Sequence, residues 1–171
     1  RLLLHGAYSY KAMTYNGATP LLFASLKGHT AAVKLLLEHG ADANKAMNNC
    51  ATTIYYAAKN GHSDVARLLL ERGADVALTT SDGESALLRT CYNGHEACAR
   101  VLLDKGAAVD VAMQGGLSPL LITLAGGPVA AVQLLVQQGA AVDLMAWLLC
   151  LAWRRLARSR PPPRARTCAG L

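Results

Sequence analysis

Residues 28–40 read GHTAAVKLLLEHG, and variants of this stretch recur three times further along the chain. They stand at residues 61–73 (GHSDVARLLLERG), 94–106 (GHEACARVLLDKG) and 127–139 (GPVAAVQLLVQQG), each 33 residues after the one before. A constant period of about 20 to 50 residues indicates a solenoid, in which each unit buries its apolar face only against its neighbours. The sequence therefore predicts a repeat protein.

Each repeat has the pattern of two short helices joined by a turn. The second helix carries apolar residues at helical spacing, for example Val33, Leu36 and Leu37, and ends at a glycine such as Gly40, which suits a left-handed helix end. The first helix is expected to follow a hydroxyl residue, whose oxygen accepts from the free amides of the first turn. The residues at this capping position are Thr19, Thr52, Ser85 and Ser118.

The repeat closely resembles the ankyrin repeat. It contains NGATPL at 16–21, GH at 28–29, LLL at 35–37 and GADAN at 40–44, close to the family pattern of G-x-T-P-L, G-H, L-L-L and G-A-D-x-N. The resemblance extends over about residues 2–143. It implies an all-α solenoid of helix-turn-helix units with β-hairpin-like loops at right angles to the helices. It also implies a concave surface that binds other proteins.

We divide the chain at the period of 33 residues. Residues 1–15 resemble the end of a truncated preceding repeat, so the chain looks like a fragment. The units that follow are three ankyrin repeats at 16–48, 49–81 and 82–114, a degenerate or incomplete repeat at 115–143, and an apolar, then Arg/Pro-rich tail at 144–171 that we expect to be disordered at its end.

Several residues depart from the family pattern. Repeat two has Cys50 and Thr53 where the turn glycine and the proline are usual, and repeat four has Gly127-Pro128 in place of Gly-His, which should weaken its turn. The His that follows T-P-L in ankyrin repeats is replaced in every copy, so we expect the hydrogen bond that it supplies to be absent from all four. The residues at that position are Leu22, Tyr55, Leu88 and Leu121.

Charge is distributed unevenly along the chain. The chain has 17 Lys and Arg against 11 Asp and Glu, a net charge of +6, and residues 144–171 carry six arginines and no acidic residue. The repeats are therefore neutral overall, and binding of nucleic acid or anionic membrane is expected only through the tail. The longest apolar run, residues 144–153, has about half the length that a membrane-spanning helix requires.

The five cysteines are odd in number and irregularly spaced, without a C-x-x-C pair. This pattern argues against a disulfide framework and against a zinc site. We expect a reducing compartment, cytoplasmic or nuclear, rather than secretion.

Two groups of residues raise the question of chemistry. His29, His62 and His95 share one position of the repeat, but equivalent atoms of successive repeats lie about 10 Å apart, too far for common zinc ligands. A buried turn residue that hydrogen-bonds the backbone is favoured. Cys91 and Cys98 flank one of these turns, but no third group is placed to orient a Cys–His pair, so a core role is favoured. We predict no catalytic, metal or cofactor site, no enzyme and no small-molecule substrate.

Residues that the repeat does not need for its own fold are the candidates for partner binding. In ankyrin-like repeats such positions face the concave surface and the loop tips, and Tyr and Arg are enriched at binding hot spots. A solvated surface, with ordinary packing of Phe23 and Tyr56, is the alternative. Ala18, Asn48 and Glu84 are further candidates of the same kind. The main candidates are Tyr15, Asn16, Phe23, Lys27, Asn49, Tyr56, Lys59, Asn60, Asp82, Arg89, Tyr92 and Asn93.

The tail leaves four interpretations open. It can be a poor cap for repeat four with a solvated basic end, or a non-native end from an altered reading frame or a retained intervening sequence. It can also be an arm for nucleic acid or anionic membrane. Finally, Leu149-Cys150 and Arg154-Arg155 are faintly similar to the start of a SOCS box.

The function expected from the repeats is that of a non-catalytic scaffold or adaptor, which binds another protein through its concave face and loop tips. One alternative is electrostatic binding of nucleic acid or anionic membrane through the tail. Another is substrate recognition within a ubiquitin-ligase adaptor.

Overall fold

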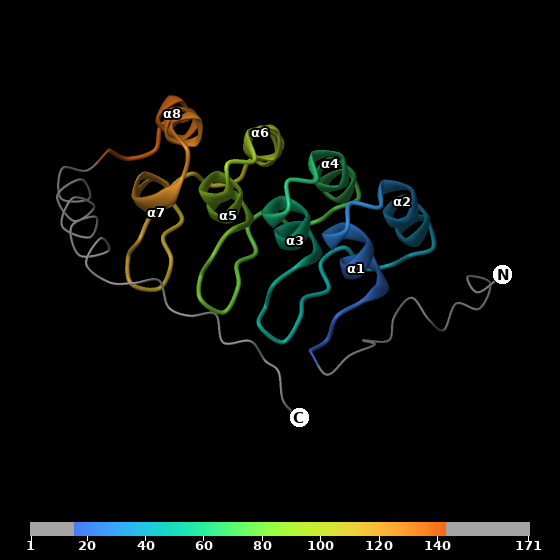
Figure 1. Cartoon of the computed structure of the whole chain (residues 1–171). Coiled ribbons are helices and arrows are strands. Elements are labelled where there is room, and N and C mark those ends of the chain that lie inside the picture. Colours follow the sequence, from blue (N-terminus) through green and yellow to red (C-terminus); the bar gives the residue numbers. More distant parts are fainter. Residues whose placement is uncertain (1–15, 143–171) are drawn as a thin grey trace, which may run out of the picture.

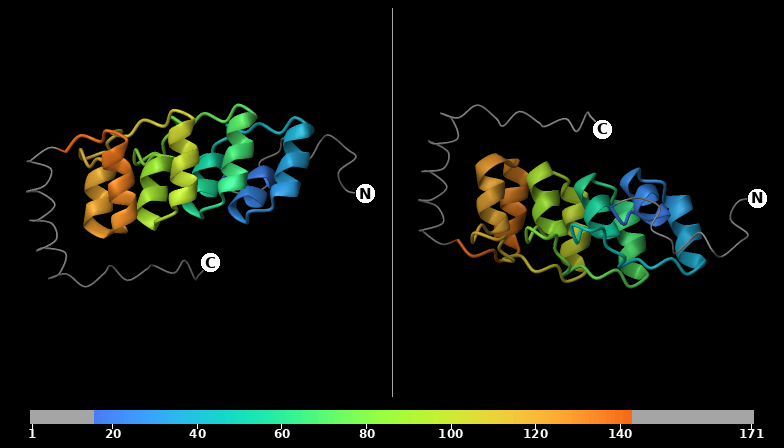
Figure 2. Two further views of the ribbon diagram at one scale, coloured as in Figure 1. Left: turned by 90° about the horizontal axis from the view of Figure 1, so that it is seen from above. Right: turned by 90° about the horizontal axis from the view of Figure 1, so that it is seen from below.

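The computed structural model describes residues 16–142, which form eight helices in four helix-turn-helix pairs. One helix of each pair stands in an inner row and the other in an outer row, and Figures 1 and 2 show the pairs stacked side by side. The inner helices are α1 (Pro20–Leu26), α3 (Thr53–Lys59), α5 (Ala86–Asn93) and α7 (Pro119–Gly126). The outer helices are α2 (Thr30–Glu38), α4 (Ser63–Glu71), α6 (Glu96–Asp104) and α8 (Val129–Gln137). This is the expected all-α solenoid.

The core lies between the two rows and between successive repeats. The apolar stripe of the outer helices is buried at Val33, Val65 and Leu69, and the inner helices add Ile54 and Leu87. Helix α3 packs against both α1 and α5, and α5 packs against both α3 and α7. Each fully buried aliphatic side chain contributes about 1.5 to 3 kcal/mol. Helices this short are marginal alone, so packing between neighbours holds them.

Hydroxyl caps begin three of the inner helices. The side-chain oxygen of Thr19 accepts from Leu22 N at 3.2 Å, and Ser85 and Ser118 make the same contact in their own repeats. Thr52 also stands at the N-cap but makes no such bond, and its hydroxyl is buried without a partner, as is that of Thr53. The capping prediction is therefore wrong for repeat two.

Hairpin loops, here called fingers, precede α3, α5 and α7. They comprise residues 47–51, 80–84 and 113–117, and each is closed by a backbone hydrogen bond of 2.9–3.0 Å from its first amide to its last carbonyl. Figure 1 shows them extending from the inner row on the side opposite the outer helices. Thr79 and Ser85 add one antiparallel bridge at the base of a finger. The fingers match the expected β-hairpin-like loops.

The Gly-His turns of repeats two and three join these repeats to the repeat before each. His62 Nε2 lies 3.0 Å from the Leu26 carbonyl oxygen, and His95 Nε2 lies 3.1 Å from that of Lys59. These two rings are half-buried and His29 is exposed, so none of the three is the fully buried residue that the sequence suggested. The hydrogen bond to the backbone is confirmed for His62 and His95. The turn glycine of the repeat before makes room for the imidazole ring, because a Cβ on Gly28 would lie 2.6 Å from His62 Nδ1.

Candidate partner-binding face

The exposed positions of the inner helices form one continuous face, here called the inner-helix face. Phe23, Tyr56 and Arg89 occupy the same position in α1, α3 and α5, and Ile122 continues this row on α7. Tyr92 lies on the face near the end of α5. Phe23 is 49% exposed and Tyr92 40%, whereas Tyr56, Arg89 and Ile122 are half-buried.

A polar network supports the middle of this face. The carboxylate of Glu84 accepts from Arg89 Nε at 3.2 Å and also from Arg89 Nη2, and it accepts from the Tyr55 hydroxyl at 2.5 Å. The Arg89 guanidinium lies over the Tyr92 ring, with its carbon 5.7 Å from the ring centroid. The Tyr55 and Tyr56 rings meet edge to face, with their centroids 5.5 Å apart. Arg89 and the tyrosines are therefore held in place without a partner.

Three candidate asparagines make hydrogen bonds within the chain. Asn60 Nδ2 donates to the Tyr56 carbonyl, and Asn93 Nδ2 donates to the Lys59 carbonyl, each at 2.8 Å. Asn49 Oδ1 accepts from the Ala51 amide at 3.2 Å within its finger. All three side chains are exposed, but part of their hydrogen-bonding capacity serves the fold.

The finger tips, and Asn16 in the loop before α1, are linked in a row by backbone hydrogen bonds. The carbonyls of Asn16, Asn49 and Asp82 each accept from an amide of the next finger, at 3.0, 2.9 and 3.2 Å. The side chains of these three residues are exposed. The loop-tip candidates therefore lie at equivalent points along one edge of the solenoid.

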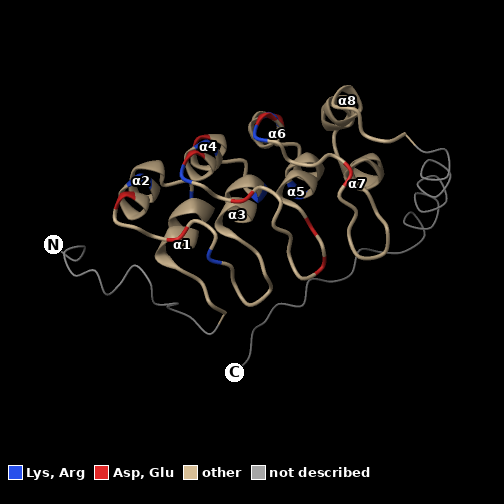
Figure 3. Ribbon diagram, turned by 180° about the vertical axis from the view of Figure 1, so that it is seen from behind, with Lys and Arg blue, Asp and Glu red and all other residues tan. Residues whose placement is uncertain are grey.

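Charged residues are not evenly spread over the repeats (Figure 3). Lys27 and Lys59 are exposed near the ends of α1 and α3. The outer helices α2, α4 and α6 carry both signs, whereas residues 111–142 contain no Lys, Arg, Asp or Glu. The inner-helix face thus changes from partly cationic in the first two repeats to apolar in the fourth.

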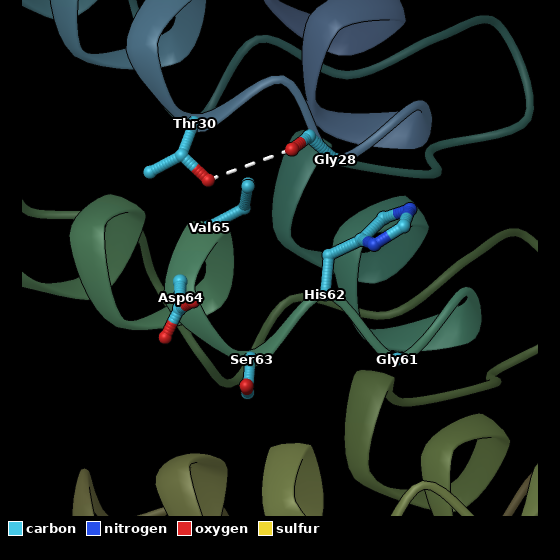
Figure 4. Close-up of a pocket in the computed structure, with 7 residues that line it drawn as sticks. All are labelled: Gly28, Thr30, Gly61, His62, Ser63, Asp64 and Val65. Atoms are coloured by element: carbon cyan, nitrogen blue, oxygen red, sulfur yellow. Dashed lines mark hydrogen bonds between the residues drawn. The ribbon is translucent and has the colours of Figure 1, made fainter.

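A small pocket of about 190 Å³ lies where the first turns of α2 and α4 meet. Figure 4 shows the residues that line it. Gly28, Thr30, His62 and Asp64 are among the residues that line it, and Thr30 Oγ1 donates to the Gly28 carbonyl at 3.5 Å. His62, which lines the pocket, has its Nε2 in a hydrogen bond with the Leu26 carbonyl of the preceding repeat.

Cys91 and Cys98 belong to the core, as expected. Burial raises the pKa of each thiol to about 12, and the neighbouring Cys98 thiol adds to the shift at Cys91. The thiolate is the nucleophilic form, so neither cysteine has an activated sulfur. Within residues 16–142 there is no cluster of three or more His, Cys, Asp or Glu that could hold a metal ion. The same part of the chain has no helix long and apolar enough to span a membrane.

Comparison with known proteins decides the family. A family model described as ankyrin repeats, three copies, matches residues 1–80 and 76–146. The chain belongs to the ankyrin-repeat family. Ankyrin repeats generally act as protein–protein interaction modules and are typically non-enzymatic. No curated protein sequence matches the chain.

One departure from the ankyrin pattern brings a hydrogen bond that was not predicted from the sequence. Tyr55 stands where ankyrin repeats usually have His, and its hydroxyl donates to Glu84 of the next repeat. Repeat two therefore has a side-chain hydrogen bond at this position, made by a tyrosine and not by the usual histidine. Tyr55 was not a candidate in the sequence, and its only signal there was a polar group at a position otherwise occupied by Leu.

Some sequence predictions lie outside the described residues. Tyr15 is one of them, and the apolar and Arg-rich tail at 144–171 is another. The possible cap, the basic arm and the similarity to a SOCS box all fall in that tail and stay predictions.

Proposed function

We propose that this chain is a non-catalytic scaffold or adaptor that binds another protein through its inner-helix face and finger tips. The observation that carries the proposal is the exposure of two aromatic side chains on that face: Phe23, at the repeat position of Tyr56 and Arg89, and Tyr92, three residues after Arg89 on α5. Large aromatic side chains that the core does not use, beside an arginine, have the composition of a binding hot spot.

Preorganisation of Arg89 supports the same proposal. Its guanidinium is fixed by the Glu84 carboxylate and stacked on Tyr92. An interface side chain that is already ordered loses less conformational entropy on binding. The exposed Lys27 and Lys59 favour acidic groups on the part of the partner that meets the first two repeats.

The proposed contact residues are those expected from the sequence. Phe23, Arg89 and Tyr92 are its main members, and Tyr56, which lies between Phe23 and Arg89 along the inner row, contributes its exposed edge. Asn60 and Asn93 lie at its border and also stabilise the helix ends. The remaining members are Asn16, Lys27, Asn49, Lys59 and Asp82, together with Tyr15 outside the described residues.

The proposed compartment is the cytoplasm or nucleus. Cys50, Cys91 and Cys98 are free thiols in the described structure, which suits a reducing environment. The alternatives of nucleic-acid or membrane binding and of a ubiquitin-ligase role depend on residues 144–171.

The test is a pull-down from cell lysate with the full chain and two alanine variants. Tyr92→Ala removes an exposed ring from the inner-helix face, whereas Val129→Ala removes an exposed side chain from outer helix α8. Tyr56→Ala is a less clean probe, because Tyr56 packs against Tyr55. Circular dichroism checks that all chains are equally helical.

The expected result is a set of proteins captured by the wild-type chain and by Val129→Ala but lost with Tyr92→Ala. Identical capture by both variants would contradict the proposed face. Capture of only nucleic acid or lipid, weakening steeply with salt, would assign binding to the tail.

A further inference from the structure

Repeat four leaves an apolar surface uncovered at the end of the stack. Leu70 and Leu103, at one position of α4 and α6, are partly buried against the core. Val136 occupies the same position of α8 and is 46% exposed. Similarly, Val76 and Val109 pack against the core, whereas the equivalent Val142 is 66% exposed. Figure 1 places α7 and α8 at one end of the row of helices.

The inner helix of repeat four shows the same difference. Leu121 is half-buried, although Leu22, Tyr55 and Leu88 at the same position are buried. Leu124, one turn after Leu121 on α7, packs partly against the core but is only half-buried, whereas its counterparts Ser25, Ala58 and Cys91 are fully buried. We define the end face as Leu121, Leu124, Val136 and Val142.

The composition of repeat four fits a surface that is covered. Residues 111–142 contain no charged side chain, whereas each of the other three outer helices carries both signs. Solvated helices normally carry charge, and contiguous exposed apolar residues mark a docking surface.

The shape of the end face disfavours a further copy of the same repeat as its cover. Ser25, Ala58 and Cys91 are small and buried where each inner helix meets the next. Leu124 stands at this position in repeat four. The larger side chain prevents an inner helix from approaching as closely as α3 approaches α1. The cover must therefore differ in shape from an ordinary repeat.

We propose that residues 144–156 of the same chain cover the end face. This segment reads LMAWLLCLAWRRL and is apolar except for Arg154 and Arg155. It begins two residues after Val142, so no long connection separates it from the surface. As a helix its 13 residues would extend about 20 Å, enough to cross both α7 and α8. In this proposal the cover of the end face belongs to the same chain.

The tryptophans provide a direct test in the full chain. Trp147 and Trp153 are the only two in the sequence, and both lie in the proposed cover. Their emission is expected to be blue-shifted relative to the chain unfolded in urea, and acrylamide should quench it several-fold less. Both properties should be independent of protein concentration. If acrylamide quenched the tryptophans of the folded chain as strongly as those of the chain in urea, the proposal would be overturned. This comparison uses the wild-type chain alone.

A pair of substitutions on α8 identifies the surface involved. Val136→Asp places a charge in the end face. Val129→Asp is the matched control, because Val129 is 72% exposed and its counterparts Thr30, Ser63 and Glu96 are polar. Val136→Asp should shift the emission to the red and raise quenching several-fold, whereas Val129→Asp should change neither. Equal effects of the two, or a blue shift that disappears on dilution and so points to a second copy, would contradict intramolecular cover.

Discussion

At the scale of single residues, Cys50 has the least favourable backbone conformation. Its φ is 60°, and it is the one non-glycine residue with positive φ among residues 16–142. The same position of the other repeats is held by Gly17, Gly83 and Gly116, all with positive φ. A side chain in the left-handed region costs about 1 to 2 kcal/mol relative to the right-handed one.

Cys50→Gly should therefore stabilise the protein by about 1 kcal/mol, measured as the free energy of urea unfolding. Cys50→Ala is the control, since it removes the sulfur but keeps the Cβ atom. If Cys50→Gly were no more stable than Cys50→Ala, strain at this position would be excluded.

The two glutamate–arginine pairs of repeat three should differ in their contribution to stability. Glu84 and Arg89 are mostly buried, at 15% and 26% side-chain exposure, and Tyr55 also donates to Glu84. Glu96 and Arg100 form an exposed pair one helical turn apart. Glu84→Gln should cost about 1 to 2 kcal/mol, because a half-buried guanidinium loses its counter-charge.

Glu96→Gln is the matched control and should cost about 0.5 kcal/mol or less. The measurement is chemical unfolding of both variants at the same ionic strength. Equal losses would show that the network under the inner-helix face adds no stability.

The buried thiols make stability depend on pH in alkaline solution. Burial raises the pKa of Cys91 and Cys98 from 9.0 to about 12 in the folded chain. Their contribution to stability is therefore complete below about pH 9 and is lost as the pH rises toward 12, because the unfolded chain releases protons that the folded chain retains.

Cys98→Ala tests this effect, and Ala131 already fills the same position in repeat four. Above pH 9 the free energy of unfolding of the variant should fall less steeply than that of wild type, by about 1.4 kcal/mol per pH unit. The measurement is urea unfolding of both chains from pH 8 to pH 11. If the free energies of unfolding of wild type and Cys98→Ala fell in parallel over this range, the raised pKa of Cys98 would be contradicted.

At the scale of the structural element, the Gly-His turn depends on the absence of a side chain. Gly61 and Gly73 both have positive φ, at 75° and 85°. A Cβ on Gly61 would lie 2.6 Å from His95 Nδ1, whereas one on Gly73 would meet nothing within 4 Å. Gly61→Ala must therefore displace the ring that hydrogen-bonds the Lys59 carbonyl.

Gly61→Ala should destabilise the protein more than Gly73→Ala does, by about 1 to 3 kcal/mol, the typical cost of overpacking. Gly73→Ala measures backbone strain alone, because its Cβ would meet no other atom within 4 Å. Comparison of their thermal unfolding midpoints tests the difference, and similar midpoints would mean that the His ring moves aside freely.

Much of the element pattern can be predicted from the sequence, because most helices and turns recur with the period. The helix pairs, the left-handed glycines and three of the four caps follow from the repeated positions of Gly, Leu and Ser or Thr. The failures involve residues that depart from the period. Thr52 makes no cap bond beside the unusual Thr53, and Tyr55 reaches Glu84 across a repeat boundary, a contact that periodicity alone does not indicate.

Repeat four also shows that the period does not predict the structure where residues depart from it. Its Gly127 has a φ of −87°, so this turn is not left-handed like the turn at Gly94. Pro128 takes the place of His, and a Cβ on Gly94 would lie 2.9 Å from its Cγ. The proline thus fills the space of the imidazole, but it has no N–H to donate to the preceding repeat.

At the scale of the whole molecule, stacking turns a sequence position into a continuous surface. Phe23, Tyr56 and Arg89 are 33 residues apart in the chain, yet they lie on neighbouring helices of the inner row. The period alone therefore predicts which residues share the inner-helix face. Which of them a partner contacts depends on the shape and charge of that partner, which the sequence of this chain does not contain.

Photo-crosslinking tests most directly whether partners bind to the inner-helix face. The photoreactive residue p-benzoylphenylalanine would be introduced in the full chain at Tyr92 on α5, or at Val129 on α8 as the control. After irradiation in lysate, we predict discrete protein adducts from position 92 that are missing from position 129. The same adducts from both positions, or adducts from position 129 alone, would contradict binding through the inner-helix face.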